Sequence, residues 1–200
     1  AICDKLNINQ NAKIISFFDH SVGYVGVMTV EEHRQFIDGM LMLARGNPSS
    51  YFFFNSKKDL SQLKIRVGED VLRLINSIEK MPNCFFANEF DWNAYDVMRI
   101  SDLVVSAPMS TVIFEALCGG VKTITFDPLS QYVNYDIVTN KFPNFNAINY
   151  DELDKLVNYW LYQCTNQDFD VFLSDHIKSN VDQNCCETSM IDRLKEFLYV

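Results

Sequence analysis

The feature that most constrains the fold is a strand–helix–strand pattern from Ser101 to Pro128, which reads SDLVVSAPMSTVIFEALCGGVKTITFDP. Two short β-rich runs, DLVVSAP and VKTITFDP, flank about three helical turns that stop at two glycines. Two strands joined by one helix in so short a segment form a βαβ unit, whose strands are parallel and buried on both faces. The segment therefore predicts an α/β protein.

The same alternation of strand and helix signals continues along the whole chain. Strands are expected within residues 12–21, 49–56, 83–90, 102–108, 121–128 and 145–150. Helices are expected within 29–48, 60–81 with a break near Gly68, 91–101, 110–120, 151–164 and 190–200. This alternation predicts one doubly wound parallel sheet, a Rossmann-like fold with C-terminal helices. Because 200 residues suffice for one core, residues 1–200 are predicted to be a single domain.

The helix expected within 29–48 has the clearest start signal. Thr29 suits the N-cap position, and Glu32 stands three residues later, which is the spacing of a capping box. Apolar residues then recur at the spacing of one helix face; they are Phe36, Ile37, Met40, Leu41 and Leu43. His33 follows two glutamates, and we expect it to be solvated. The sequence therefore predicts an amphipathic helix with a polar first turn.

Composition excludes several classes of protein. The net charge is −9 and the isoelectric point about 4.7, whereas a nucleic-acid-binding protein needs a basic face. No apolar run approaches the roughly 18 residues that a membrane-spanning helix needs. The six cysteines show neither a CxxC pair nor a zinc-binding spacing. We therefore expect free cysteines, most of them small core residues, in a reducing cytoplasm, and neither nucleic acid nor a metal as a partner.

Glu115 is the one charged side chain in the apolar run VIFEALC, and no local rule explains it. Ser110 or Thr111 can cap this helix, and a capping box would need Glu or Gln three residues after the cap. Glu115 comes four residues after Thr111, so both lie on one helix face. A helix N-terminus favours phosphate, and a nearby carboxylate can accept two hydrogen bonds from a ribose. The pattern favours a nucleotide site at Ser110, Thr111 and Glu115; the alternative is that Glu115 points into water.

Other candidate residues follow strands whose carboxyl ends should meet at the same edge of the sheet. His20, after the first strand, is the candidate catalytic residue, as a contact to a phosphate or a leaving group. Ser21 beside it is a candidate substrate ligand. Phe90 and Trp92, after the third strand, are candidates to stack on a base. The alternatives are a surface histidine and aromatic side chains that pack under the next helix.

The run DVMRISDLVVSAPMSTVIFEALCGGVKTITFDP resembles the C-terminal, donor-binding domain of GT-B glycosyltransferases, especially those of bacterial surface polysaccharides such as capsule and teichoic acid. That family's pattern is aDlvIs-x-x-ST-x-x-x-EAl-x-x-G-x-p-x-I. The residues that fit it are Asp102, Ser110, Thr111, Glu115, Ala116 and Gly120. The resemblance is strong over residues 91–128 and weaker from Ala12 to Tyr150. Met109 stands where glycine is frequent, and Val121-Lys122 replaces the usual proline.

The resemblance implies a nucleotide sugar linked to UDP, CDP or CMP, with the Ser/Thr helix tip at the donor phosphate and Glu115 at the ribose. Transfer would proceed without a metal or other cofactor, by stabilisation of the leaving nucleoside phosphate. GT-B enzymes carry the acceptor, and usually the catalytic base, on an N-terminal domain. This chain is therefore expected to be a donor half that works with an acceptor domain in the same or another chain.

Several alternatives stay open at this point. Asp168-Phe169-Asp170 matches the DxD metal motif of the other glycosyltransferase fold, but it lies between late helices rather than after a strand. The chain could also be a non-catalytic nucleotide-sugar-binding or assembly module, or a relative of the non-hydrolysing sugar-nucleotide epimerases, so its enzyme activity is undecided. The resemblance implies a cytoplasmic location, with peripheral association of the full-length protein at the inner face of the membrane as a further option. The donor sugar, the base and the acceptor are not fixed.

Overall fold

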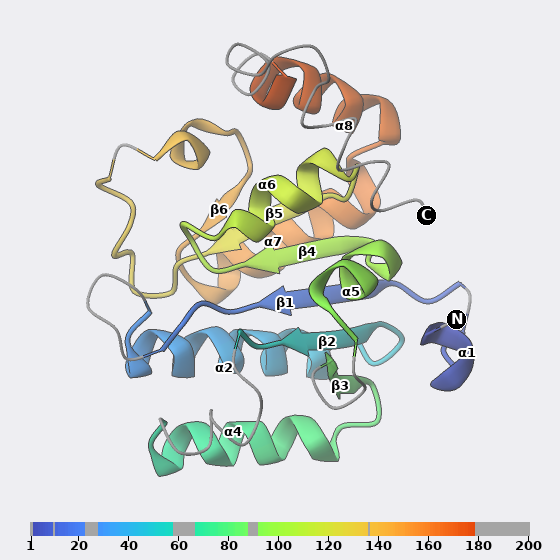
Figure 1. Ribbon diagram of the computed structural model, residues 1–200, viewed down its shortest axis with the longest axis vertical. Coiled ribbons are helices and arrows are strands. Elements are labelled where there is room, and N and C mark those ends of the chain that lie inside the picture. The colour runs from blue at the N-terminus through green and yellow to red at the C-terminus, as the bar shows by residue number, and fades with distance from the viewer. Residues whose placement is uncertain are drawn as a thin grey trace.

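The computed structural model describes residues 2–9, 11–22, 28–57, 67–87, 92–135 and 137–178. Within these residues, six parallel strands form one sheet in the order β3-β2-β1-β4-β5-β6 (Figure 1). The strands are β1 (Ile14–Phe18), β2 (Tyr51–Asn55), β3 (Cys84–Phe86), β4 (Leu103–Ser106), β5 (Thr123–Phe126) and β6 (Asn146–Ala147). This is the Rossmann order, and it confirms the predicted doubly wound parallel sheet.

The helices alternate with the strands as expected. They are α1 (Ile2–Lys5), α2 (Val30–Gly46), α4 (Glu69–Lys80), α5 (Ala94–Ile100), α6 (Thr111–Cys118), α7 (Tyr150–Asn158) and α8 (Asn166–Phe172). The described residues also include three short helical turns. These are the 3₁₀ turn η2 (Val138–Lys141) and the π-helical turns η3 (Tyr159–Gln163) and η4 (Leu173–Lys178). Of the helix predicted within 60–81, the described part is α4, which begins at Glu69, directly after the break expected near Gly68; residues 58–66 lie outside the described residues. The helix predicted within 190–200 lies outside the described residues.

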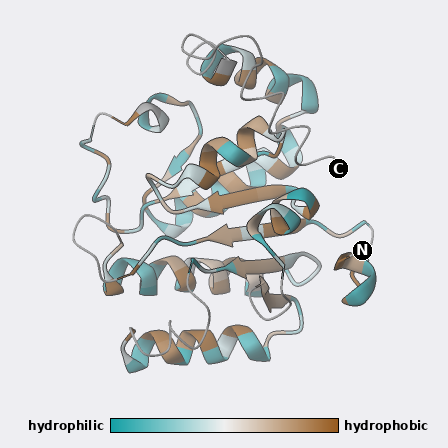
Figure 2. Ribbon diagram, viewed as in Figure 1, coloured by the Kyte–Doolittle hydropathy of each residue, from teal (hydrophilic) through white to brown (hydrophobic). Residues whose placement is uncertain are grey.

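Hydrophobic side chains fill both faces of the sheet. Along β1, Ile15 and Phe17 belong to the core cluster that includes α2, whereas Ile14 and Phe18 belong to the cluster that includes α5. Every residue of β1, β4 and β5 is buried, as expected for parallel strands covered on both sides. Figure 2 shows these strands as a hydrophobic layer between helices that are hydrophobic on one side.

The helix ends follow the sequence signals. Thr29 and Glu32 form the predicted capping box of α2, and Ser110 is the N-cap of α6. At the end of α6, Gly120 has φ 79°. Its N–H donates to the carbonyl of Leu117, and the N–H of Val121 donates to that of Ala116 at 2.9 Å. These two bonds form a Schellman motif, which explains the glycine at position 120.

The strands all run in one direction, so the sheet has two chemically different edges. In Figure 1 the arrowheads point left, toward the loops that follow β1, β4 and β5, and α1 lies at the opposite edge. No helix among the described residues is long and apolar enough to cross a membrane. Four cysteines are described, and all are free thiols; Cys84, Cys118 and Cys164 are buried, as predicted, and Cys3 is half-buried.

Candidate functional site

The candidate site lies where the strand order reverses, at the carboxyl ends of β1 and β4. These strands are neighbours in the sheet, although two strands and three of the described helices separate them in sequence. The backbone N–H of Ala107, just after β4, donates to the carbonyl of Phe18 at the end of β1, at 2.9 Å. The two loops therefore start side by side, which is the position at which doubly wound sheets bind ligands.

The loop after β4 delivers the N-terminus of α6 to this position. The Ser110 side chain accepts from the backbone N–H of Val112 at 3.4 Å, whereas Thr111 is exposed as the first helical residue. No described residue accepts a hydrogen bond from the N–H of Met109 or of Thr111. Unpaired N–H groups at a helix N-terminus are donors that suit an anion such as phosphate.

Met109 makes this turn with an unusual backbone. Its φ is 60°, in the left-handed region, and its side chain is 53% exposed. A residue with a Cβ is strained there by roughly 1–2 kcal/mol, and glycine is not. The turn needs a left-handed residue, which is the geometry that glycine adopts most easily. The turn forms in this chain despite the methionine.

Glu115 lies one helical turn beyond Thr111 and is half-buried. It forms a hydrogen bond with the side chain of Tyr95 on α5. Burial is the largest cause of the raised pKa of Tyr95, and the negative charge of Glu115 raises it further. Because a carboxylate can only accept, the Tyr95 hydroxyl donates and orients Glu115 while other lone pairs stay available. Glu115 therefore has a neighbour that orients it, and its role as a ribose ligand stays a prediction.

His20 stands at the end of β1, in the same group of loops. The backbone N–H of Ser21 donates to Nδ1 of His20 at 2.8 Å, so the proton of the neutral ring is on Nε2. Burial, and then the charge of Lys57, lowers the pKa of His20, while Asp19 acts in the opposite direction. The favoured form is therefore a neutral imidazole that can donate one hydrogen bond from Nε2.

Beneath His20, the Asp19 carboxylate joins three elements. It accepts from the Ser56 hydroxyl at 2.6 Å, from the backbone N–H of Lys57 at 2.6 Å and from Nε2 of His33 at 3.0 Å. The expectation that His33 is solvated was wrong, because its ring is fully buried. His33 lies three and four residues before Phe36 and Ile37, so it continues the apolar face of α2, and this spacing was the signal that local charge obscured.

Sequence reasoning also missed a polar group next to this network. Glu32, besides capping α2, is fully buried, and burial is the largest cause of its raised pKa; the nearby charge of Asp127 raises it further. Asp127, after β5, accepts from the backbone N–H of Tyr132 at 2.8 Å and so holds the next loop. In the described residues, Oε1 of Glu32 and Nδ1 of His33 are buried without a hydrogen-bond partner. Unpaired buried polar atoms therefore lie at the carboxyl edge, the side of the sheet where the carboxyl ends of the strands meet.

Of the two aromatic candidates for base stacking, the structure describes only Trp92. Phe90 lies outside the described residues. Trp92 is half-buried, and its ring packs against Phe53 with centroids 6.1 Å apart. This contact corresponds to the packing alternative; base stacking by either residue stays a prediction.

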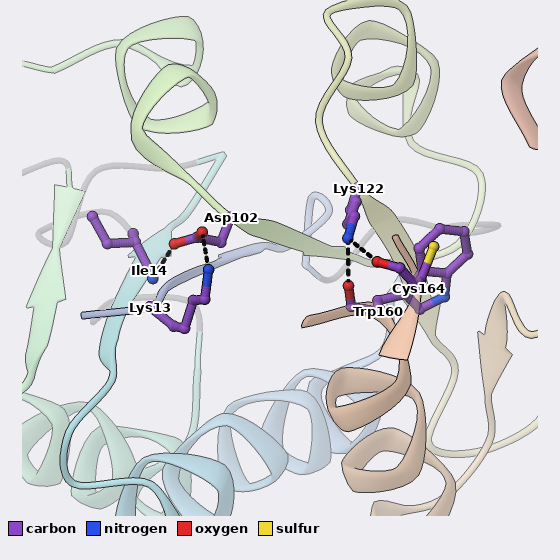
Figure 3. A network of polar contacts seen from close by, with 6 residues as sticks. All are labelled: Lys13, Ile14, Asp102, Lys122, Trp160 and Cys164. Atoms are coloured by element: carbon purple, nitrogen blue, oxygen red, sulfur yellow. Dashed lines mark hydrogen bonds and ion pairs between the residues drawn. The ribbon is translucent and has the colours of Figure 1, made fainter. Parts of the chain in front are cut away.

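Two sequence motifs lie away from the site. Asp102 precedes β4, at the opposite edge of the sheet, where it accepts from Nζ of Lys13 at 2.8 Å and from the N–H of Ile14 at 2.9 Å (Figure 3). It therefore fixes the start of β1. Asp168 belongs to a capping box with Thr165 at the start of α8, and Phe169 is buried. Among the described residues, no group of three or more His, Cys, Asp or Glu side chains is placed to hold a metal ion.

Comparison with protein families gives one match. The model of the family described as "Polysaccharide biosynthesis PFTS motif protein" matches residues 23–157. The tetrapeptide Pro108-Met109-Ser110-Thr111 resembles the four letters in that description, with proline first and hydroxyl residues in the last two places. This is the turn that leads into α6. No protein among the curated sequences matches the chain.

Several solved structures share the fold at low sequence identity. A UDP-forming α,α-trehalose-phosphate synthase from Burkholderia vietnamiensis has 9% identity and a TM-score of 0.63 over 99% of this chain and 44% of its own. The wall teichoic acid polymerase TagF has 12% identity and a TM-score of 0.53 over 99% and 43%. A putative UDP-N-acetylglucosamine 2-epimerase from Listeria monocytogenes has 13% identity and a TM-score of 0.51 over 94% and 49%. The chain thus spans less than half the length of each.

Proposed function

Because this chain belongs to the family of polysaccharide biosynthesis PFTS motif proteins, we propose that it is the nucleotide-sugar-binding domain of a glycosyltransferase that makes a cell-surface polysaccharide or glycoconjugate. The observation that carries the proposal is the N-terminus of α6. It brings unpaired N–H groups, the Thr111 hydroxyl and the Glu115 carboxylate to the point where the strand order reverses. A phosphate and a ribose need this combination of donors and acceptor.

Each residue then has a distinct role. The diphosphate or monophosphate of the donor accepts from the N–H groups of Met109 and Thr111 and from the hydroxyl groups of Ser110 and Thr111. Glu115, oriented by Tyr95, accepts from the ribose hydroxyls. These contacts position the sugar at the mouth of the loops that follow β1 and β4.

His20 acts on the leaving group. When the sugar–phosphate bond breaks, negative charge develops on the phosphate oxygen, and a preorganised donor lowers the energy of that state. The neutral His20 ring presents one proton at Nε2, because Nδ1 already accepts from Ser21. The acceptor and the base that activates it belong to a second domain, since the chain spans less than half of the trehalose-phosphate synthase it resembles. We propose a cytoplasmic location, where nucleotide sugars would be supplied.

Calorimetric titration of UDP, CDP and CMP tests the donor site. For whichever nucleotide binds, Glu115→Gln should lower affinity by about ten- to a hundredfold, since a charge-assisted hydrogen bond is weakened. Glu69→Gln is the matched control, because Glu69 is an exposed glutamate in the first turn of α4. Tyr95→Phe should lower affinity less, because it removes only the group that orients Glu115. Equal affinity in wild type and Glu115→Gln would exclude Glu115 as the ribose ligand, and no binding of any nucleotide would reject the donor site.

The epimerase remains a second candidate, because the fold of the Listeria protein covers 94% of this chain. The two functions differ in their products. A transferase donor domain, joined to its acceptor domain, releases a nucleoside phosphate only with an acceptor present. An epimerase interconverts sugar nucleotides without one. Incubation of the two-domain protein with nucleotide sugars, followed by product separation, distinguishes them.

A further inference from the structure

A cavity lies at the edge of the sheet opposite the candidate site. Its volume is about 460 Å³, within the usual range for small-molecule sites. Its walls come from residues just before β1, β4 and β5, from the C-terminal ends of α5 and α6, and from the junction between η3 and α8. Because these segments are the amino ends of strands, the cavity is separate from the loops that hold His20 and Ser110.

The charge of this cavity contrasts with that of the whole chain. Lys13, Arg99 and Lys122 line it, and Asp102 is the single carboxylate in its wall. Its lining is therefore net positive, whereas the chain carries a net charge of −9. In an acidic protein, a recess in which cations outnumber carboxylates attracts anions and disfavours cations.

The two lysines are held in place by partners within the fold. Nζ of Lys13 lies 2.8 Å from the Asp102 carboxylate, and Nζ of Lys122 donates to the carbonyls of Trp160 and Cys164 at 2.9 and 2.6 Å (Figure 3). The partners of Lys122 are neutral carbonyls, so its positive charge is not cancelled. A fixed charge interacts with a ligand without loss of side-chain entropy on binding.

Arg99 differs from both lysines. It lies in the last turn of α5 and is exposed, and it makes no hydrogen bond or ion pair with the residues that the structure describes. A guanidinium group offers a planar fork of donors that matches the oxygens of a phosphate. Arg99 is thus the lining cation whose donors are available to a ligand.

We propose that this cavity is a second ligand site, for a small organic molecule that carries a phosphate group. Arg99 binds the phosphate through its paired donors, and the fixed ammonium group of Lys122 supplies the surrounding positive charge. The apolar side chains of Val121 and Leu161, which also line the cavity, contact the organic part of the ligand. The site is independent of the proposed nucleotide site, because it shares no residue with it.

Calorimetric titration with phenyl phosphate, a small aromatic phosphate ester, tests the proposal at low ionic strength. The wild-type chain should bind in the millimolar range or tighter, and Arg99→Gln should lower affinity by about tenfold or more. Arg73→Gln is the matched control: Arg73 is also an exposed helix arginine, on α4, and does not line the cavity. The affinity of Arg73→Gln for phenyl phosphate should equal that of wild type. Melting curves verify that all three proteins are folded.

The alternatives give different results. No binding by wild type, or an affinity that Arg99→Gln leaves unchanged, would overturn the proposal. An equal loss of affinity in Arg73→Gln would show general attraction of anions to the surface. Displacement of phenyl phosphate by the nucleotide that binds at Glu115 would place the ester at the other site. Either result also overturns the proposal. Flotation with phosphatidylcholine vesicles that contain phosphatidic acid identifies the source of the phosphate. Binding that requires Arg99 would point to a lipid, and absence of vesicle binding to a soluble ester.

Discussion

The two ends of helix α6 require the same backbone geometry and obtain it with different residues. Gly120, after the helix, has φ 79°, and Met109, before it, has φ 60°. Gly120 adopts this conformation without strain, because it has no Cβ; Met109 does not. The glycine closes a Schellman motif that serves the fold, whereas the methionine lies at the candidate site. Strain of this kind is found where surrounding structure, and often function, fixes the backbone.

The two edges of the sheet show a parallel contrast in their polar groups. At the amino edge, Asp102 and Lys122 are satisfied by partners within the fold. At the carboxyl edge, buried atoms of Glu32 and His33 lack partners among the described residues. Unpaired buried polar groups reduce stability, so the carboxyl edge carries a cost that the satisfied groups of the amino edge do not. The comparison can be tested by substitution on each side.

Removal of one aspartate from each edge should give the largest difference. Asp19→Ala deletes a buried carboxylate with three donors and should cost about 3–5 kcal/mol in the free energy of unfolding. Asp102→Ala should cost about 1–2 kcal/mol, because the Asp102 side chain is 33% exposed and its partner Lys13 can return to water. Urea denaturation at pH 7 measures both values. If Asp19→Ala does not fold, Asp19→Asn keeps the shape of the side chain, and its cost in free energy of unfolding should lie between the two values. Equal losses would contradict the contrast between the edges.

Relief of the strained turn should have a smaller, stabilising effect. Met109→Gly should raise the free energy of unfolding by about 0.5–1 kcal/mol, because relief of the left-handed strain exceeds the entropy that glycine loses on folding. Met109→Ala is the control, since alanine keeps the Cβ and should leave stability nearly unchanged. Thermal melts compare the three proteins. A glycine variant no more stable than the alanine variant would show that φ at this position is not strained.

The smallest expected effect depends on pH. Burial raises the pKa of Glu32 in the folded protein, so the folded state favours protonation relative to the unfolded chain. This contribution is fully present below the unfolded pKa and is lost as pH rises through the folded value. Glu32→Gln should therefore leave the melting temperature unchanged near pH 4. At pH 7.5 it should raise the free energy of unfolding by roughly 1 kcal/mol or less, which corresponds to a rise in melting temperature of about 2–4 °C. Glu69→Gln, at an exposed position, should show no such dependence. A pH-independent effect of Glu32→Gln would argue against burial as its cause.

Local sequence signals were enough to predict the architecture. The alternation of β-rich and helical runs predicted the parallel sheet, and hydroxyl residues before helical runs predicted the caps at Thr29 and Ser110. Each of these features depends on residues within about one helical turn of each other, so a linear reading can find it.

The site was harder to predict, because its contacts join distant segments. His33 meets Asp19 only because α2 packs against the end of β1, and Tyr95 meets Glu115 only because α5 and α6 lie beside each other. A family pattern alone also does not give each residue its role: Asp102 fits the donor-domain pattern, and only the structure shows that its carboxylate fixes the start of β1 at the opposite edge of the sheet. Such pairings depend on how helices and strands pack together, and a local sequence pattern does not show that packing.

The Lys122 side chain has a consequence for how the chain opens. Its ammonium donates to carbonyls 38 and 42 residues further along the chain, so it closes a long loop without a covalent bond. The π-helical turn η3 cannot separate from the start of β5 unless both bonds break together. Backbone amides in η3 should therefore exchange with deuterated solvent in the same cooperative step as those of the central strands, instead of fraying first like a peripheral helix.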